Sequence, residues 1–353
     1  MKKQLTHGGD WAGYLAAHGT EALDFSANIS PLGIPDGVRK ALAASADLAD
    51  RYPDPLCRSL CEALSRHDDV PVDYVLCGAG AADLIFRIAL ALRPRTALVT
   101  APAFAEYETA LKTVDCQVRH YHLPMDRDFR PQEDILDAIT EDIDVFFLCE
   151  PNNPSGVTTP KALLYRILEK CRQTGTRLIL DECFVGLLAD PAGHTMIDEL
   201  GKYPNLLIMK AFTKLYALAG VRLGYALCAD EALLDRMREV AQPWAVSTVA
   251  QTAGLAALEE VAYEQRVRDL ITTERPWLAQ GLSDLGLRVI PGEANYLLFQ
   301  SPETPLLTSL EERGILVRSC SNYVGLDDSW YRCAVRTHEE NVRLMAALKE
   351  ILA

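Results

Sequence analysis

The stretch that decides the fold is Lys210-Ala-Phe-Thr-Lys214-Leu-Tyr-Ala-Leu-Ala-Gly220-Val-Arg222, which follows a short apolar run at 206–209. Such a run is typical of a buried strand, so Lys214 is expected just beyond a strand end, where burying an ammonium group is costly. A lysine in this position suits a Schiff-base nucleophile whose pKa is lowered by its surroundings. Arg222 is placed to face an anion held by the same loop. Taken alone, however, the stretch favours an ordinary surface-loop lysine.

Short apolar runs alternate with helical patterns over the first two thirds of the chain. Further buried strands are predicted at 72–77, 96–100, 143–149, 177–180 and 223–228. Helices are predicted between them, at 82–92 and 161–173. This alternation indicates an α/β domain with a mostly parallel sheet.

The pattern changes after about residue 235. Helical stretches at 231–240 and 248–285 precede short strands at 288–290, 294–299, 315–318 and 331–335, and a last helix is predicted at 339–352. The first thirty residues show little periodic structure. We therefore expect an N-terminal arm at 1–35, a large domain at 36–235 and a smaller α+β C-terminal domain at 236–353.

The composition narrows the classes of function. The 353-residue chain carries a formal charge of −14, which disfavours nucleic acid and anionic membrane as partners. No signal peptide opens the sequence, and no apolar run approaches the roughly 20 residues that a membrane span needs. The ten cysteines include no CxxC pair. We interpret them as buried free thiols of a cytoplasmic protein, and predict neither a metal site nor disulfides.

Polar residues follow two of the predicted strands. Asp181 ends the run at 177–180, and a carboxylate at this edge of an α/β sheet is placed to keep a pyridine nitrogen protonated. Asn153, in Glu150-Pro-Asn-Asn153-Pro-Ser-Gly156, follows the run at 143–149 as a hydrogen-bond donor. The alternatives are a helix N-cap for Asp181 and an Asx turn for Asn153.

A turn of small residues, Cys77-Gly-Ala-Gly80-Ala81-Ala82-Asp83, joins a strand to an apolar helix. Small residues let backbone N–H groups approach a phosphate at a helix N-terminus. The spacing is not GxGxxG, so a dinucleotide site is disfavoured.

In their order along nearly the whole chain, these segments resemble the fold-type I pyridoxal-phosphate (PLP) enzymes, the superfamily of the class I/II aminotransferases. The resemblance implies a three-layer α/β/α large domain and PLP bound to Lys214 as a Schiff base, with Asp181 on the pyridinium and Asn153 on the 3′-oxygen. It also implies a homodimer in which Tyr52 reaches the neighbouring active site. The remaining cofactor contacts that it implies are Gly80, Ala81, Ala82, Thr213 and Arg222 at the phosphate and Phe104 stacked on the ring.

Two positions depart from the usual aminotransferase pattern. Ala211 stands three residues before Lys214, where a serine or threonine usually binds the cofactor phosphate. Phe184 stands three residues after Asp181, where many aminotransferases have a tyrosine that donates to the 3′-oxygen. Both donors are therefore missing, and the electronics of the bound cofactor are expected to differ.

The N-terminal and C-terminal segments narrow the resemblance to the threonine-phosphate decarboxylases of cobalamin biosynthesis, which are close to the histidinol-phosphate aminotransferases. The segments are His7-Gly-Gly-Asp10, Leu23-Asp-Phe-Ser-Ala-Asn28, 314–318 and 331–341. They imply a phosphorylated amino-acid substrate, whose carboxylate and phosphate both suit arginine. Arg332 would take the carboxylate, Arg318 either group, and Arg336 neither. The other substrate contacts implied are His7, Gly8, Gly9, Asn28 and Asn153.

The leading hypothesis is thus PLP-dependent decarboxylation of L-threonine O-3-phosphate to (R)-1-amino-2-propanol O-2-phosphate. A decarboxylase of L-serine O-phosphate, giving ethanolamine phosphate, stays open, since one methyl group is worth only about 1–3 kcal/mol in discrimination. An aminotransferase for histidinol phosphate and a PLP-binding protein without turnover are further alternatives.

Overall fold

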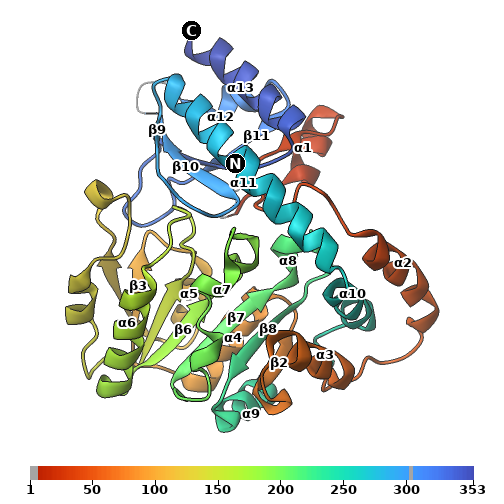
Figure 1. Cartoon of the computed structure of the whole chain (residues 1–353), viewed down its shortest axis with the longest axis vertical. Coiled ribbons are helices and arrows are strands. Elements are labelled where there is room, and N and C mark those ends of the chain that lie inside the picture. Colours follow the sequence, from red (N-terminus) through yellow and green to blue (C-terminus); the bar gives the residue numbers. More distant parts are fainter. Residues whose placement is uncertain (1–6, 302–304) are drawn as a thin grey trace.

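The computed structural model describes residues 7–301 and 305–353 and contains a large and a small sheet (Figure 1). The large sheet has seven strands in the order β2-β8-β7-β6-β5-β3-β4. The strands from β7 to β4 are parallel, while β8 runs antiparallel to both of its neighbours. Their bounds are Val75–Gly78 (β2), Thr96–Ala101 (β3), Gln117–His122 (β4), Val145–Cys149 (β5), Arg177–Asp181 (β6), Leu206–Ala211 (β7) and Gly224–Cys228 (β8).

Helices cover both faces of this sheet, because successive side chains of its central strands point to opposite sides. Phe146 and Leu148 of β5 belong to one core, whereas Val145 and Phe147 belong to the other. The first core contains side chains of α3 (Arg58–Asp68), α6 (Lys161–Thr174) and α10 (Thr248–Leu258). The second contains side chains of α4 (Ala81–Leu92), α5 (Glu106–Lys112) and α9 (Glu231–Glu239). The expected three-layer α/β/α arrangement is confirmed.

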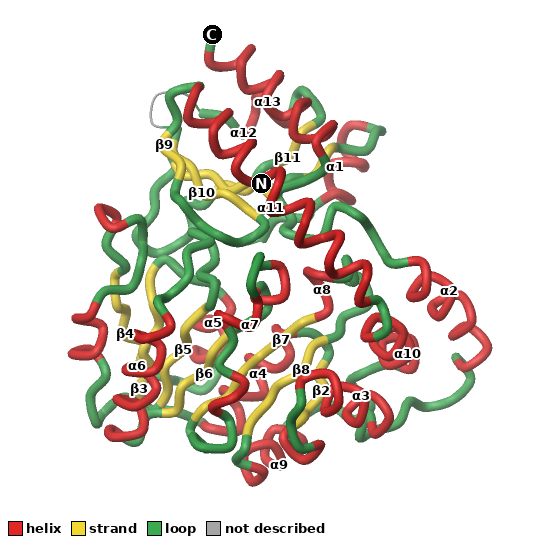
Figure 2. Tube along the Cα trace, in the orientation of Figure 1, coloured by secondary structure: helices red, strands yellow, loops and turns green. Residues whose placement is uncertain are grey.

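The small sheet is antiparallel and has the order β12-β13-β10-β9. These strands are Arg318–Ser319 (β12), Trp330–Ala334 (β13), Tyr296–Gln300 (β10) and Arg288–Val289 (β9). The helices α11 (Val261–Asp284), α12 (Leu307–Glu311) and α13 (His338–Leu352) lie beside it, as Figure 2 shows. The N-terminal segment joins this part of the molecule, since β1 (Leu23–Asp24) pairs in parallel with β11 (Ile315–Leu316).

Several local expectations were wrong. Residues 315–318, expected to form one strand, are divided between β11 and β12, which belong to different sheets. Residues 11–18, expected to lack periodic structure, form the helix α1 (Trp11–His18), in which Tyr14 is the one buried residue. The edge strand β4 was missed because its polar sequence alternates between exposed and half-buried positions. Residues Val72–Tyr74, expected to begin a strand, form a 3₁₀ turn.

The other helices are α2 (Asp36–Ala44), α7 (Pro191–His194) and α8 (Phe212–Leu215). In the described ranges, no helix combines the length and the apolar character needed to cross a membrane.

Candidate functional site

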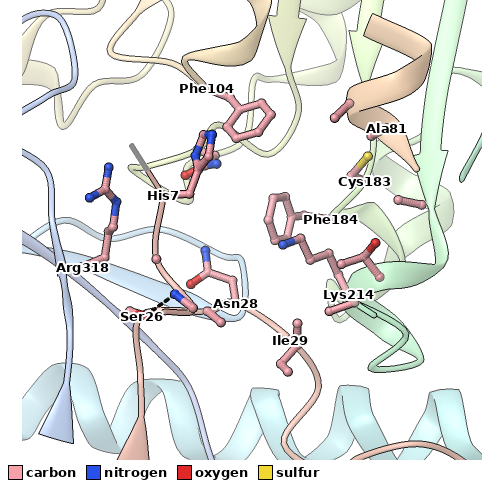
Figure 3. A pocket seen from close by; sticks show the side chains of 18 of the residues that line it. His7, Ser26, Asn28, Ile29, Ala81, Phe104, Cys183, Phe184, Lys214 and Arg318 are labelled. Atoms are coloured by element: carbon pink, nitrogen blue, oxygen red, sulfur yellow. Dashed lines mark hydrogen bonds between the residues drawn. The ribbon is translucent and has the colours of Figure 1, made fainter. Parts of the chain in front are cut away.

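A cavity of about 440 Å³ opens between the carboxyl ends of the large sheet's strands and the small sheet (Figure 3). Cys149, Asp181 and Ala211, which end β5, β6 and β7, all line it. Ligands of open α/β sheets bind at this edge. The predicted residues that line the cavity are His7, Gly8, Gly9, Asn28, Ala81, Ala82, Phe104, Asn153, Asp181, Thr213, Lys214, Arg222, Arg318 and Arg332.

Lys214 lies on α8, the single helical turn that follows β7, and faces the cavity (Figure 3). Its Nζ lies 5.3 Å from the centroid of the Phe184 ring. Burial of the ammonium group, reinforced by the positive charge of Arg332, lowers the pKa of Lys214 to about 8. A substantial fraction of this amine is therefore neutral near physiological pH, as a nucleophile that attacks an aldehyde requires.

Asp181 is held from two sides. The hydroxyl of Tyr107 donates to its Oδ2 at 2.5 Å, and the backbone N–H of Cys183 donates to its Oδ1 at 3.0 Å. Tyr107 is fully buried and stacks on Phe147, with 5.1 Å between ring centroids. Burial, together with the charge of Asp181, raises the pKa of Tyr107 well above its usual value. Tyr107 therefore stays protonated and donates to the carboxylate.

An anion cradle is built where β2 leads into α4. Gly80 has φ +88° and comes directly before the helix, whose N-terminus has no side-chain cap. A Cβ at Gly80 would lie 2.6 Å from Nη2 of Arg222, so only glycine lets the guanidinium approach the turn this closely. A Cβ at Gly224 would lie 3.0 Å from the backbone nitrogen of Ala81. The uncapped N–H groups and the guanidinium together suit a phosphate.

Arg332 reaches the cavity floor from β13. Its Nη1 donates to Oδ1 of Asn153 and, at 3.3 Å, to the hydroxyl of Tyr323, while Nη2 donates to the backbone oxygen of Ser26 at 3.1 Å. Its buried Nε has no partner in the described part of the chain. Neither amide atom of Asn28, which is 2 % exposed, has a partner there either. Such orphaned groups at a cavity wall indicate a polar ligand.

Arg318 and His7 lie on the side of the cavity opposite Lys214 (Figure 3). Nη2 of Arg318 donates to Oδ1 of Asn322 at 2.5 Å. Nε2 of His7 lies 2.6 Å from a carboxylate oxygen of Glu106, and its ring lies 5.4 Å from that of Phe104. A guanidinium group and an imidazole thus lie on this side of the cavity, although the whole chain is acidic.

Gly8 and Gly9 let the N-terminal segment lie close to the wall formed by Ser26. A Cβ at Gly8 would lie 2.5 Å from the Ser26 backbone oxygen. The N–H of Gly9, which has φ +87°, donates to Oγ of Ser26 at 2.7 Å. The backbone of residues 8 and 9 is thereby anchored beside the cavity.

Gly80, Tyr52 and Arg336 do not line the cavity, although Gly80 lies next to its lining residue Ala81. Tyr52 is 80 % exposed and stacks on Trp244, with 4.5 Å between ring centroids. Arg336 forms an ion pair with Glu340, on the first turn of α13, at 2.6 Å.

Sequence reasoning missed Tyr107, Tyr323 and Trp11. Tyr323 donates to Asn153 Oδ1 at 3.3 Å, and Trp11 lines the cavity mouth although it is 60 % exposed. Nothing in the sequence distinguishes Tyr107 from a core aromatic, since its partner Asp181 lies 74 residues away.

The site fits the expected cofactor. Three features surround one cavity: a lysine with a lowered pKa, a carboxyl group held by two hydrogen-bond donors, and an anion cradle. They match the aldehyde, the ring nitrogen and the phosphate of PLP. Orphaned atoms of Asn28 and Arg332 remain for a second, anionic molecule.

Comparisons with known proteins give a consistent result. Residues 20–348 match the family model described as aminotransferase class I and II. Threonine-phosphate decarboxylase of Salmonella typhimurium is 40 % identical over 98 % of this chain and 96 % of its own. Histidinol-phosphate aminotransferase of Nitratidesulfovibrio vulgaris is 31 % identical over 94 % of this chain and 89 % of its own. The crystal structure of L-threonine-O-3-phosphate decarboxylase from Porphyromonas gingivalis has a TM-score of 0.84 and 26 % identity, covering 93 % of this chain and 99 % of that one.

Proposed function

The chain belongs to the aminotransferase class I and II family of PLP-dependent enzymes, and on that premise we propose that it decarboxylates L-threonine O-3-phosphate. The product would be (R)-1-amino-2-propanol O-2-phosphate, a precursor in cobalamin biosynthesis. The observation that carries this proposal is the 40 % identity, over nearly the full length of both chains, to a threonine-phosphate decarboxylase. The aminotransferase relative is 31 % identical.

PLP, when bound, supplies an electron sink for the electrons of the broken Cα–carboxylate bond. Lys214 would hold the cofactor, and Asp181 would bind its ring nitrogen while accepting from Tyr107. Arg222 and the backbone amides of Ala81 and Ala82 would bind the phosphate, beside Thr213. Phe104 would cover the ring.

The substrate has two anionic groups, a carboxylate and a phosphate, and each would bind to a different arginine of the site. Arg332 would bind the carboxylate, since it lies close enough to Lys214 for its charge to lower the lysine's pKa. Arg318, which lies directly across from Arg332 on the neighbouring strand, would bind the substrate phosphate together with His7 and Asn28. Holding the substrate at both ends would orient the carboxylate bond for cleavage.

The released Lys214, protonated as the ammonium, would donate a proton to Cα after CO₂ departs. Its pKa of about 8 suits proton transfer near neutral pH. Phe184, 5.3 Å from Nζ, adds an apolar wall and no further hydroxyl donor.

The experiment that tests the function compares three substrates on the purified holoenzyme: threonine phosphate, serine phosphate, and histidinol phosphate with 2-oxoglutarate. CO₂ and amine products are measured separately. Release of CO₂ from threonine phosphate without a 2-oxo acid is expected. Absence of CO₂ from both phosphorylated amino acids overturns the proposal, and formation of glutamate from histidinol phosphate would favour an aminotransferase. Unchanged turnover in Lys214→Ala would rule out the assigned role of the lysine.

We further propose a cytoplasmic homodimer with an arm at 1–35, a large domain at 36–235 and a small domain at 236–353. All ten cysteines are free, as is typical of a reducing compartment. The exposed Tyr52–Trp244 pair supports a role outside its own subunit, namely contact with the partner's cofactor phosphate. The two sheets, formed by residues 75–228 and 288–334, support the division between the domains.

A further inference from the structure

Three cysteines gather outside the active-site cavity, where α3 packs on β2. Cys57 comes directly before α3, Cys61 lies one turn into it, and Cys77 lies on β2. The sulfurs of Cys61 and Cys77 are 3.7 Å apart, while the two residues are separated by 16 positions in sequence. A disulfide has a sulfur separation of about 2.05 Å, so the two sulfurs must approach each other by more than an ångström to form one.

A separate cavity of about 340 Å³ borders these thiols and lies beside the Tyr52–Trp244 pair that is proposed to contact the partner subunit. Cys57, Cys61 and Cys77 all line it, together with Arg238 and residues 241–246. Water-sized molecules fit in a space of this volume. Cys61 is 8 % exposed.

The surroundings shift the pKa values of the two thiols in opposite directions. The hydrogen bond with Cys77 and the positive charge of Arg238 lower the pKa of Cys61. Hydrogen bonds with Cys57 and Cys61, together with burial, raise the pKa of Cys77 well above its usual value. Cys61 is therefore the more acidic of the two thiols and the one expected to attack an oxidant, with Cys77 as the neighbouring thiol 3.7 Å away.

We propose that Cys61 and Cys77 form a reversible oxidation site that takes hydrogen peroxide as its oxidant. The Cys61 thiolate attacks peroxide, which gives a sulfenic acid and hydroxide as the O–O bond breaks. The Cys77 thiol then displaces the sulfenic oxygen as water, and the S–S bond forms. Two electrons pass from the two sulfurs to one peroxide, and a dithiol such as dithiothreitol reverses the reaction.

The disulfide would be coupled to the anion cradle. The Cys77 carbonyl accepts from Nη1 of Arg87 at 3.5 Å, and Nε of Arg87 donates to Asp83 at 2.9 Å. Asp83 also accepts from the N–H of Ala79 at 2.7 Å, within the turn that leads to Gly80. Drawing Cys77 toward α3 by more than an ångström would therefore pull on the turn, and would weaken its hold on the PLP phosphate.

The test treats holoenzyme with peroxide, alkylates remaining thiols after denaturation, and identifies cross-linked peptides by mass spectrometry. Two of the ten thiols should be lost. The cross-linked peptide pair should join Cys61 to Cys77, and dithiothreitol should restore both thiols. Cys61→Ser and Cys77→Ser should each abolish the cross-link. Cys116→Ser should leave the cross-link intact, because this thiol, which is equally 8 % exposed, contacts the Gln117 backbone oxygen and no other sulfur among the described residues.

Retention of both thiols in folded protein, or a cross-link through Cys57 instead, overturns the proposal. Should either serine variant fail to fold, the wild-type protein still decides, because the peptide is read directly. The coupling is tested by PLP loss during dialysis, which should be about tenfold faster for the oxidised protein. Equal rates of PLP loss would overturn the coupling.

Discussion

The hydroxyl of Tyr107 donates a hydrogen bond of 2.5 Å to the carboxylate of Asp181, the residue assigned to the ring nitrogen of PLP. This tyrosine is fully buried, so the contact that holds the carboxylate lies in the protein interior. Tyr107 lies on α5 and Asp181 ends β6, so the contact joins a helix on one face of the sheet to the edge that carries the cavity.

Tyr107→Phe is expected to reduce catalysis while the fold is retained, because the ring still stacks on Phe147. A hydrogen bond to a charged group contributes about 1.5–3 kcal/mol, which corresponds to roughly a 10–100-fold change. Without this donor, only the backbone N–H of Cys183 holds the carboxylate, so its pairing with the ring nitrogen is weakened. The measurements are kcat for CO₂ release and the visible spectrum of bound PLP. An unchanged kcat would show that Cys183 alone suffices to hold Asp181.

The lowered pKa of Lys214 predicts how PLP recombines with the cofactor-free protein. Only the neutral amine attacks the aldehyde, so the rate of recombination should rise with pH and level off above a midpoint of about 8. Stopped-flow absorbance between pH 6 and 11 measures this profile. A midpoint near the ordinary value of 10.5 would contradict the burial argument. Lys214→Arg, which keeps the charge but cannot form the bond, is the control that should show no such spectral change.

The orphaned amide of Asn28 predicts a substrate contact that is independent of the cofactor. Asn28→Asp keeps the shape but places a negative charge where the substrate phosphate is proposed to bind. We expect KM for threonine phosphate to rise by roughly 100-fold, because a like charge replaces a hydrogen-bond donor. PLP affinity should stay within about threefold. A loss of PLP affinity that matches the loss of substrate affinity would place Asn28 at the cofactor instead.

Much of this site follows from the sequence, because Lys214, Asp181, Asn153 and Arg222 each come directly after or close to a recognisable buried strand. Parallel strands bring such residues to one edge of a sheet. The helix α1 could not be predicted, since it buries only Tyr14 and therefore has no apolar stripe.

Contacts between segments that are far apart in the sequence could not be predicted from the sequence either. Tyr323 meets Asn153 across 170 positions, and its loop has no periodic pattern. The departures at Ala211 and Phe184 were visible in the sequence. Their surroundings, however, depend on how β7 and the loop after β6 meet at the cavity.

The contact between His7 and Glu106 predicts that Glu106, which does not line the cavity, fixes the position of the His7 imidazole beside it. Glu106→Gln should raise KM for threonine phosphate several-fold and leave kcat nearly unchanged, because an uncharged amide orients the imidazole less well. His7→Ala should have an effect of similar size. If the two residues act through one contact, the double variant should lose little more than either single variant. Fully additive losses would show that Glu106 acts separately.

The exposed Tyr52 predicts that active sites are shared between subunits. Lys214→Ala and Tyr52→Ala homodimers should each have low activity, for different reasons. A hybrid dimer pairs an intact Lys214 with an intact Tyr52 from its partner at one site, and both defects at the other. Unfolding and refolding the two variants together at equal amounts should therefore restore roughly a quarter of wild-type CO₂ release, since half of the dimers are hybrids and half of their sites are complete. If Tyr52 instead served its own subunit, every site would carry at least one defect and mixing would restore nothing. Refolding each variant alone provides the baseline against which the gain is read.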